Sequence, residues 1–432
     1  GDVALPCPEI LRFMLSRLLP RPRDLVVEEN EFAVSGESLN HITPRVPVDG
    51  ELVTQFDVAS LDLFQVPRLT VVTNGVLNVL DMASAWVRQE ENPTFDLDAI
   101  PMDDPETYDL LGRGLTSGIA PFHSVTLKSL LRTHRPRNFT NLVKVKGMER
   151  VSDGEREPDV RDYVAECLLT YRCAFIKTHY PVSFMAAMLS HACLTSGRDR
   201  RRFTILLREA RRMGIRILPP DVNLSVYEFS YVQKGIRTGL MVVGGLGEKA
   251  YAELERVRRG GDFHDLTDLI RRTDGELITN RVLSNLARTG ALDCFGMKRA
   301  QMLRIIADHA DEVRRGGTVP GYLEESADGG VVPGPELSKV DEFPPDELIR
   351  QEILGAGYSI SQDEMHLYRD HVRQCRALAP GSLTARMVGH EVSIAGFIDH
   401  VEADSPLLED REHLLLDVEG QVVTISRKAA RL

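Results

Sequence analysis

A glycine-rich turn at residues 244–247 constrains the fold of this chain more than any other feature of its sequence. Three glycines in four residues separate an apolar run at 240–243 from an amphipathic helical pattern at Glu248–Arg258. Because glycine adopts positive φ without strain, this spacing predicts a β-like segment, a tight turn with exposed amides, and a helix. Amides at a helix N-terminus favour an anion. The alternative interpretation is an ordinary glycine turn between two packed elements.

The composition is that of a soluble globular protein with several domains. The chain has 432 residues, of which 43% are hydrophobic and 27% are charged, and its formal net charge is −12. No apolar run reaches the roughly 18 residues of a membrane helix, and the first residues lack the pattern of a signal peptide. The six cysteines form no CxxC pair, and the histidines do not cluster at metal-ligand spacing. We therefore expect a cytoplasmic protein without a membrane segment or a metal site.

Because the chain is acidic overall, contact with nucleic acid requires a local basic patch. Residues 198–216 provide one, with eight arginines against two acidic residues. Arg201, Arg202, Arg208 and Arg212 lie on a predicted helix at 200–214 and are candidate phosphate contacts. The alternative interpretation is a solvated helix face, for which such a charge run is equally typical.

Hydrophobic periodicity predicts an α+β, mostly helical, multi-domain chain. Residues 160–216 are strongly helical, and Pro181 divides two of the helices. The segment 318–345 is rich in glycine, proline and acidic residues and is the predicted linker. Helical residues follow it, and then three strands with a turn at 419–420, typical of the front of a small β-barrel.

Several segments, in order, resemble one family. They are YRCAFIKTHYPVSFMAAMLSHA, LLREARRMGIRILPPDVN, GLMVVGGLGEKAYAEL, LIRRTDGELITNRVLSNLARTGALDCFG and VSIAGFIDH. The set resembles the C-terminal half of bacterial C-family DNA polymerases, the DNA polymerase III alpha subunit family. The tail LGAGYSISQDEMHLYR is most similar to the error-prone paralogue. The glycine turn itself resembles a helix-hairpin-helix, a motif that binds the DNA backbone.

The resemblance implies a domain order. It implies a remnant palm and thumb at 1–110, a reduced fingers-like part at 111–160, a helical domain with the helix-hairpin-helix at 161–317, the linker at 318–345, and a helical segment with a partial OB-like barrel at 346–432. Within the hairpin it implies that Gly244, Gly245, Gly247 and Lys249 contact a DNA phosphate, through amides and one ammonium group.

The chain departs from this family at the catalytic centre. A C-family palm carries three aspartates that bind two metal ions for nucleotidyl transfer, and the pair expected before residue 20 is missing. The third would fall on Asp62, in a shortened segment, and Asp62 is otherwise an ordinary strand-end or helix-cap aspartate. One carboxylate cannot hold two Mg²⁺ ions, and the long fingers segment is missing as well. We therefore expect a degenerate, non-catalytic member, with Mg²⁺ as a cofactor only if activity remains.

Three functional hypotheses follow. The leading one is a protein of DNA replication or translesion repair that binds duplex DNA and scaffolds other replication or repair proteins. The second is an active or split polymerase subunit, and the third is a protein-interaction module without DNA binding. The segment SLDLF at 60–64 resembles a sliding-clamp peptide without its glutamine. The same letters fit the palm alignment and are expected to be buried, so clamp binding is not favoured.

Overall fold

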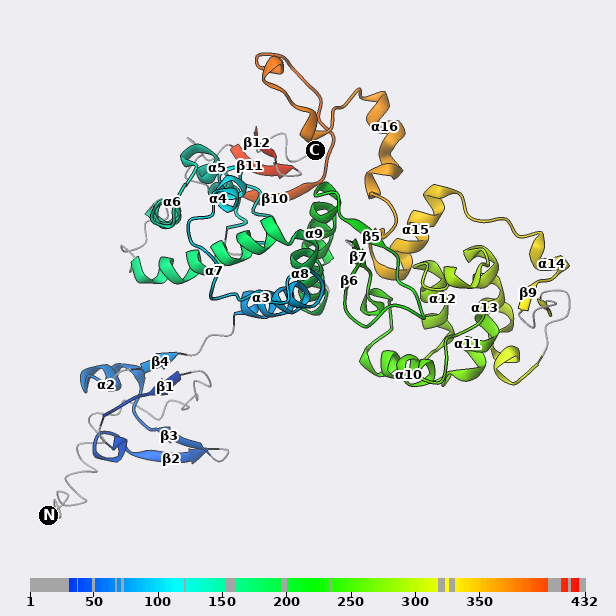
Figure 1. Ribbon diagram of the computed structural model, residues 1–432, viewed down its shortest axis with the longest axis horizontal. Coiled ribbons are helices and arrows are strands. Elements are labelled where there is room, and N and C mark those ends of the chain that lie inside the picture. Colours follow the sequence, from blue (N-terminus) through cyan, green and yellow to red (C-terminus); the bar gives the residue numbers. More distant parts are fainter. Residues whose placement is uncertain are drawn as a thin grey trace. The chain divides into compact units, whose positions relative to one another are not determined.

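The computed structural model divides the chain into two compact units, residues 1–74 and 75–432 (Figure 1). It describes residues 31–426, except 37, 49–50, 67, 71–73, 120–121, 152–159, 196–199, 234, 318–322, 326–330, 403–412 and 419–420. The stretch before residue 20, where the family's aspartate pair is expected, lies outside these residues. No helix within them combines the length and hydrophobicity that a membrane span requires.

The described part of the first unit contains two small antiparallel pairs and one short α-helix. Strands β1 and β4 pair with each other, as do β2 and β3. Helix α2 begins after Asp57, whose carboxylate accepts a hydrogen bond from the backbone N–H of Ser60 at 2.9 Å. The bounds are β1 Glu31–Ala33, β2 Arg45–Val48, β3 Glu51–Thr54, α2 Val58–Leu63 and β4 Arg68–Thr70, with a short 3₁₀ turn at Leu39–His41.

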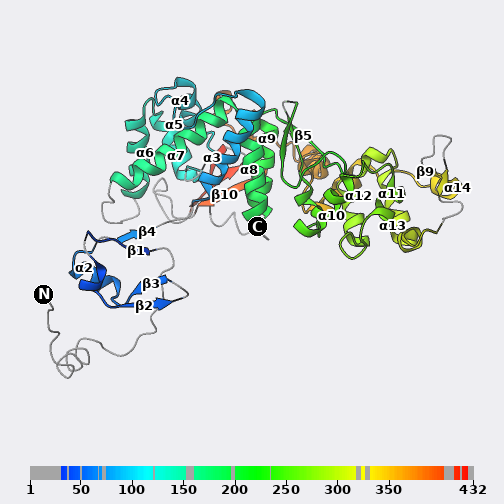
Figure 2. The same ribbon diagram turned by 60° about the horizontal axis from the view of Figure 1, so that its bottom comes forward.

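The second unit opens with a group of packed helices (Figure 2). Their ends follow local signals: Asp104 caps α4 ahead of a proline, and Pro181 starts α8 directly after α7, as predicted. Helix α8 is buried along most of its length and packs against its neighbours α3, α7 and α9. The bounds are α3 Gly75–Trp86, η2 Val87–Glu91, α4 Pro105–Gly112, α5 Val125–His134, α6 Phe139–Val151, α7 Val160–His179, α8 Pro181–Thr195 and α9 Arg200–Arg212. The predicted domain boundary at residue 110 falls within α4.

The glycine turn lies in the following part of this unit. Helix α10 has the predicted bounds, but the predicted β-like run at 240–243 is wrong, because Leu240–Val242 forms a 3₁₀ turn, η3. Its apolar residues are buried without alternation, and such a run does not distinguish a strand from a helical turn. The bounds are β5 Arg216–Leu218, β6 Ser230–Val232, β7 Gly235–Arg237, η3 Leu240–Val242, α10 Glu248–Arg258, α11 Leu266–Arg272, α12 Asn280–Arg288, η4 Asp293–Phe295 and α13 Arg299–Arg314.

The segment predicted as a linker contains ordered elements in its described part. Leu337 is fully buried, and its carbonyl accepts a hydrogen bond from Gln301 of α13 at 3.1 Å. The C-terminal half of the segment 318–345 therefore packs against the helical domain. Apolar residues such as Leu337 are interspersed among its prolines and acidic residues and are buried. The bounds are β8 Leu323–Glu325, β9 Val331–Pro333 and α14 Pro335–Ser338, followed by α15 Pro345–Ala356, η5 Glu364–Tyr368, α16 Arg369–Gln374, η6 Pro380–Ser382 and η7 Ala385–Met387.

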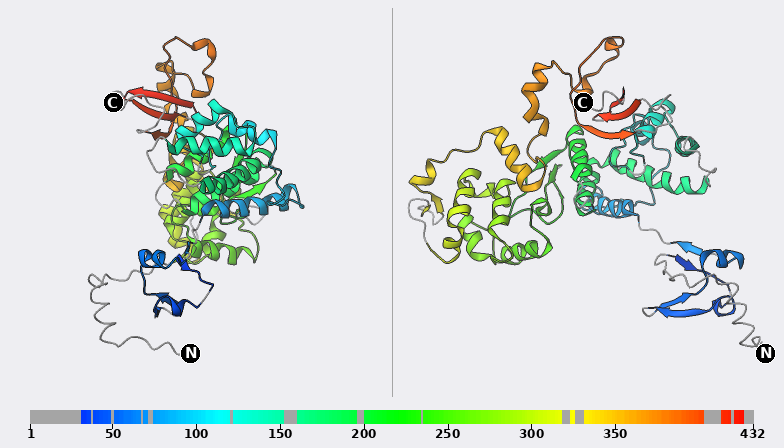
Figure 3. Two further views of the ribbon diagram at one scale, coloured as in Figure 1. Left: turned by 90° about the vertical axis from the view of Figure 1, so that its left-hand side faces the viewer. Right: turned by 180° about the vertical axis from the view of Figure 1, so that it is seen from behind.

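Three antiparallel strands end the described chain, as predicted. They are β10 Ile398–Glu402, β11 His413–Val418 and β12 Gln421–Ser426, in the order β10-β11-β12. This sheet packs beside α5, as Figure 3 shows from behind. The α+β, mostly helical class holds, and the described strands here form an open sheet of three rather than a barrel.

Candidate nucleic-acid interface

Gly245 and Gly247 are the exposed glycines of the turn, and they differ in whether the backbone conformation requires glycine. Gly245 has φ +87°, a conformation in which a side chain is strained, so the turn itself needs a glycine there. Gly247 has φ −87° and ψ 179°, which any residue adopts, and a Cβ at this position would meet no heavy atom within 4 Å. The fold therefore does not require glycine at 247, and the missing side chain leaves open space in front of the backbone.

The N-terminus of α10 faces this open space. Gly247 is its N-cap residue and provides no side-chain cap, so the first-turn amides have no acceptor within the helix. Gly247 and Lys249 are exposed, whereas Leu246 is 3% exposed and anchors the turn in the core. Exposed amides, the positive end of the helix dipole and one ammonium group together suit a phosphate. Glu248 is the one acidic residue in this turn, and its charge opposes an anion.

The turn is held from behind by two other helices. The N–H of Gly244 donates to the carbonyl of Gly355, at the end of α15, at 2.8 Å. Asn285 of α12 donates its side-chain amide to the carbonyl of Gly244 at 2.7 Å, and this asparagine is buried. The N–H of Gly244 is therefore used within the protein and fixes the turn to α15. Gly245, Gly247 and Lys249 lie on the exposed side of the turn.

The arginines of α9 are largely engaged within the chain. Arg208 is 7% exposed, donates to the carboxylate of Asp399 at 2.7 Å and lies over the ring of Phe397 at 4.2 Å. Arg212 is 3.4 Å from the same carboxylate and 3.6 Å from that of Glu209. Asp399, in β10, is only 2% exposed, so α9 and the C-terminal sheet meet in a buried charge cluster.

The remaining arginines of α9 differ in their exposure. Arg201 donates to the backbone carbonyls of Ile398 and Asp399, at 3.3 Å each, and is itself exposed. Arg202 is exposed. Arg211 donates to the carbonyls of Ser359 and Ile360, and burial lowers its pKa. Arg208 is thus committed to the C-terminal sheet, whereas Arg201, Arg202 and Arg212 are exposed members of the predicted patch.

Asp62 lies on the exposed side of α2, within a helix rather than at a strand end. Across the described ranges no three His, Cys, Asp or Glu side chains gather closely enough to hold a metal ion. The described residues therefore do not supply the carboxylates that a two-metal centre requires. Asp62 lies within the clamp-like segment 60–64, and the expected burial of this segment is wrong, since Leu63 and Phe64 are 80% and 54% exposed while Leu61 is buried.

Two parts of the chain match models of known protein families. Residues 76–172 match the family model described as the bacterial DNA polymerase III alpha subunit finger domain. Residues 214–302, from β5 to α13, match a helix-hairpin-helix motif model and include the glycine turn. The finger match begins one residue after the start of the second compact unit and is wider than the predicted fingers-like range 111–160.

Curated relatives agree with these matches. DNA polymerase III subunit alpha of Thermus aquaticus is 25% identical over 443 aligned positions, which cover 76% of this chain and 35% of the relative. That of Halalkalibacterium halodurans is 32% identical over 241 positions, with 55% and 20% covered. That of Buchnera aphidicola subsp. Acyrthosiphon pisum is 36% identical over 169 positions, with 38% and 14% covered. The chain thus spans about a third or less of the length of these relatives.

The alignment with the Thermus aquaticus relative has more positions than the number of residues of this chain that it includes. Since 76% of 432 residues cannot fill 443 positions, the relative carries segments within the aligned region that this chain lacks.

Proposed function

Because this chain is an alpha-subunit-like relative of the bacterial C-family DNA polymerases, we propose that it binds duplex DNA without sequence preference and does not polymerise. It holds a backbone phosphate at the N-terminus of α10, with the amides of the first turn and the ammonium group of Lys249. It acts in DNA replication or translesion repair, in the cytoplasm, where it scaffolds other proteins of these processes on DNA.

One observation carries the DNA-binding part of this proposal. The side of the turn that carries Gly247 and Lys249 is exposed and open, while Gly244 on the opposite side is fixed to α12 and α15 by hydrogen bonds. A turn whose inner side is already fixed by hydrogen bonds loses little conformational freedom when it binds a ligand. Such a contact reads the backbone and not the bases, so it gives affinity without sequence preference.

The proposal that this chain does not polymerise rests on the carboxylates available to bind metal ions. Among the described residues, Asp62 belongs to no group of three His, Cys, Asp or Glu side chains that could hold a metal ion.

The match to the finger domain favours a second candidate, a polymerase subunit whose metal ligands come from another chain. Primer extension with Mg²⁺ or Mn²⁺ separates the two. We expect no incorporation by this chain, and incorporation that disappears in Asp62→Ala would establish the second candidate instead.

Fluorescence anisotropy with a labelled duplex tests the DNA contact. Lys249→Ala removes one cation beside the open amides, so affinity falls and the dependence of log K on log salt becomes shallower by about 0.9. Arg259→Ala is the matched control, because it removes the same charge at the opposite end of α10 and loses only an exposed pair with Glu255. Equal effects of the two variants would contradict the assigned contact, and no binding at low salt would favour the interaction module.

A further inference from the structure

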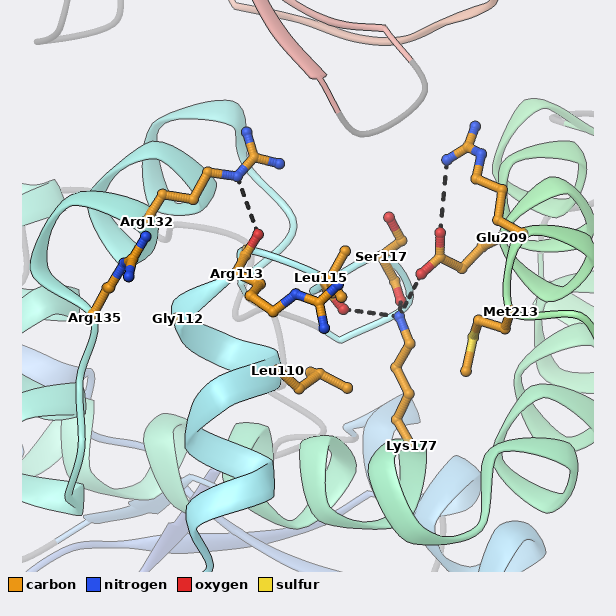
Figure 4. Close-up of a pocket in the computed structure, with 12 residues that line it drawn as sticks. Leu110, Gly112, Arg113, Leu115, Ser117, Arg132, Arg135, Lys177, Glu209 and Met213 are labelled. Carbon is orange, nitrogen blue, oxygen red and sulfur yellow. Dashed lines mark hydrogen bonds and ion pairs between the residues drawn. The ribbon is translucent and has the colours of Figure 1, made fainter. Parts of the chain in front are cut away.

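One group of titratable side chains outside the helix-hairpin-helix lines a pocket of about 690 Å³ among α4, α5, α7 and α9 (Figure 4). The amine in this lining, Lys177, is buried. It donates to the carbonyls of Leu115 and Ser117, at 2.9 Å each, and to Glu209 at 2.7 Å. All three donors of this ammonium group are therefore used inside the protein, and Lys177 holds the fold together rather than acting as a nucleophile.

A second group lies at the C-terminal end of α16. Sγ of Cys375 is 3.7 Å from Nε2 of His371, one helical turn earlier, and both residues are exposed. The chain reverses directly after the cysteine, because Arg376 adopts φ +50° and the N–H of Ala377 donates back to the carbonyl of Val372 at 3.0 Å. The thiol therefore lies at the exposed end of the helix, beside an imidazole at a hydrogen-bond distance for the large sulfur atom.

This pair has the composition of an activated cysteine. A neutral imidazole that carries its proton on Nδ1 accepts a proton at Nε2, so His371 can hold the thiol proton of Cys375 and leave a thiolate beside an imidazolium. The segment 369–376 carries three arginines and one aspartate, and this positive charge favours the thiolate. The partial negative charge at the end of α16 opposes the thiolate but stabilises the imidazolium.

Three other cysteines lie in environments that suppress the thiolate. Cys167 and Cys173 are 0% and 1% exposed, and burial raises the pKa of both to about 12. Cys294 is exposed as a residue, but partial burial of its sulfur and the carboxylate of Asp221 raise its pKa to about 12. Because Cys294 combines surface access with a suppressed thiolate, exposure alone does not distinguish Cys375, whereas its histidine does.

We propose that Cys375 is a thiol-exchange site, with His371 as its base and a small anionic disulfide such as oxidised glutathione as the reagent. Nε2 of His371 takes the thiol proton, and the sulfur of Cys375 attacks one sulfur of the disulfide. The S–S bond of the reagent breaks, a new S–S bond joins Cys375 to one half of it, and the other half leaves as a thiol with the proton from His371. The cysteine is oxidised to a mixed disulfide, half of the reagent is reduced, and a free thiol reverses the step.

Mass spectrometry of the native protein treated with oxidised glutathione tests the role of the base. An ordinary cysteine is a few per cent thiolate at pH 7, so a base that holds its proton accelerates exchange by up to about 30-fold. His371→Ala should therefore slow modification of Cys375 about tenfold at pH 7 and less than about twofold at pH 10, where an ordinary thiol ionises without a base. A merely structural effect of the substitution would change both rates alike. His390→Ala is the control, because it removes another exposed imidazole and leaves the pair intact.

The same experiment compares two exposed cysteines and tests the charge of the reagent. Cys375 should be modified before Cys294, and its rate should fall as salt screens the arginines from the anionic disulfide. Equal rates for the two cysteines, or an unchanged rate at pH 7 in His371→Ala, would overturn the site. A rate that rises with salt would overturn the assignment of an anionic reagent. None of these measurements involves DNA, so their outcome is independent of the α10 contact.

Discussion

Gly247→Asp separates binding from stability at the N-terminus of α10. The structure requires no glycine at this position, because the backbone angles are ordinary and the space in front is open. An aspartate is a preferred N-cap residue, and its carboxylate accepts hydrogen bonds from the same first-turn amides that a phosphate would use. The substitution therefore fills the proposed phosphate site with an anion that is part of the chain.

The two expected effects have opposite signs. A side-chain cap in place of glycine adds a few tenths of a kcal/mol to stability, and a negative charge at this end of the dipole adds about 0.3–1 kcal/mol. Repulsion between the carboxylate and a phosphate about 4 Å away is worth about 1 kcal/mol in water and about 4 kcal/mol near a protein surface. The duplex should therefore bind roughly fivefold to several-hundred-fold more weakly to a protein that melts at the same or a higher temperature.

The assay combines thermal melting with anisotropy of a labelled duplex at low salt. Pro344→Asp is the matched control, because Pro344 is the exposed N-cap residue of α15, also without a side-chain cap, and lies outside the helix-hairpin-helix match. Weaker binding in Gly247→Asp alone supports the assigned contact. Undiminished affinity in Gly247→Asp, with the cap formed and the melting temperature raised, would refute the reasoning.

Three further outcomes follow from the buried groups. Asp399→Ala leaves the guanidinium of Arg208 buried without its partner, so urea unfolding should show a loss of about 3–5 kcal/mol; a loss below about 1 kcal/mol would mean that the pair does not hold the sheet. Burial raises the pKa of Cys173 to about 12, so at pH 8 a thiol reagent should modify exposed Cys375 in the native protein and Cys173 only after unfolding; rapid native modification of Cys173 would contradict its burial. Burial of Asp104 raises the pKa of its carboxyl, but hydrogen bonds from Thr107 and His179 outweigh this effect and lower it from 3.8. Its stabilising contribution is therefore complete above the ordinary pKa and is lost as pH falls below about 4, so urea unfolding of Asp104→Asn should lack this acid-dependent step.

Local signals were sufficient to predict the elements around the turn. Glycine at the N-cap and apolar residues at helical spacing gave the bounds of α10. The 3₁₀ turn at Leu240–Val242 could not be predicted in this way, because a short apolar run that is buried on all sides carries no period.

Side-chain partners distant in the sequence could not be predicted. Nothing near Arg208 indicates that its carboxylate partner is Asp399, because the fold alone brings these two positions together. The pocket among α4, α5, α7 and α9 was also not predicted from the sequence, because Arg113 and Arg132, which line it, belong to the ends of different helices. The turn itself was predicted, because glycine adopts the positive φ that Gly245 shows, but nothing in the sequence indicates that the N–H of Gly244 donates to the carbonyl of Gly355.

The central claim is that the amides at the start of α10 contact a DNA phosphate. The most direct measurement is a titration of ¹⁵N-glycine-labelled protein with a short duplex, followed through the amide signals. We predict that the signals of Gly245 and Gly247 shift with increasing duplex, while that of Gly244, whose N–H is bound to the carbonyl of Gly355, shifts less. Shifts confined to glycines outside residues 214–302, with Gly245 and Gly247 unmoved at saturation, would contradict the claim.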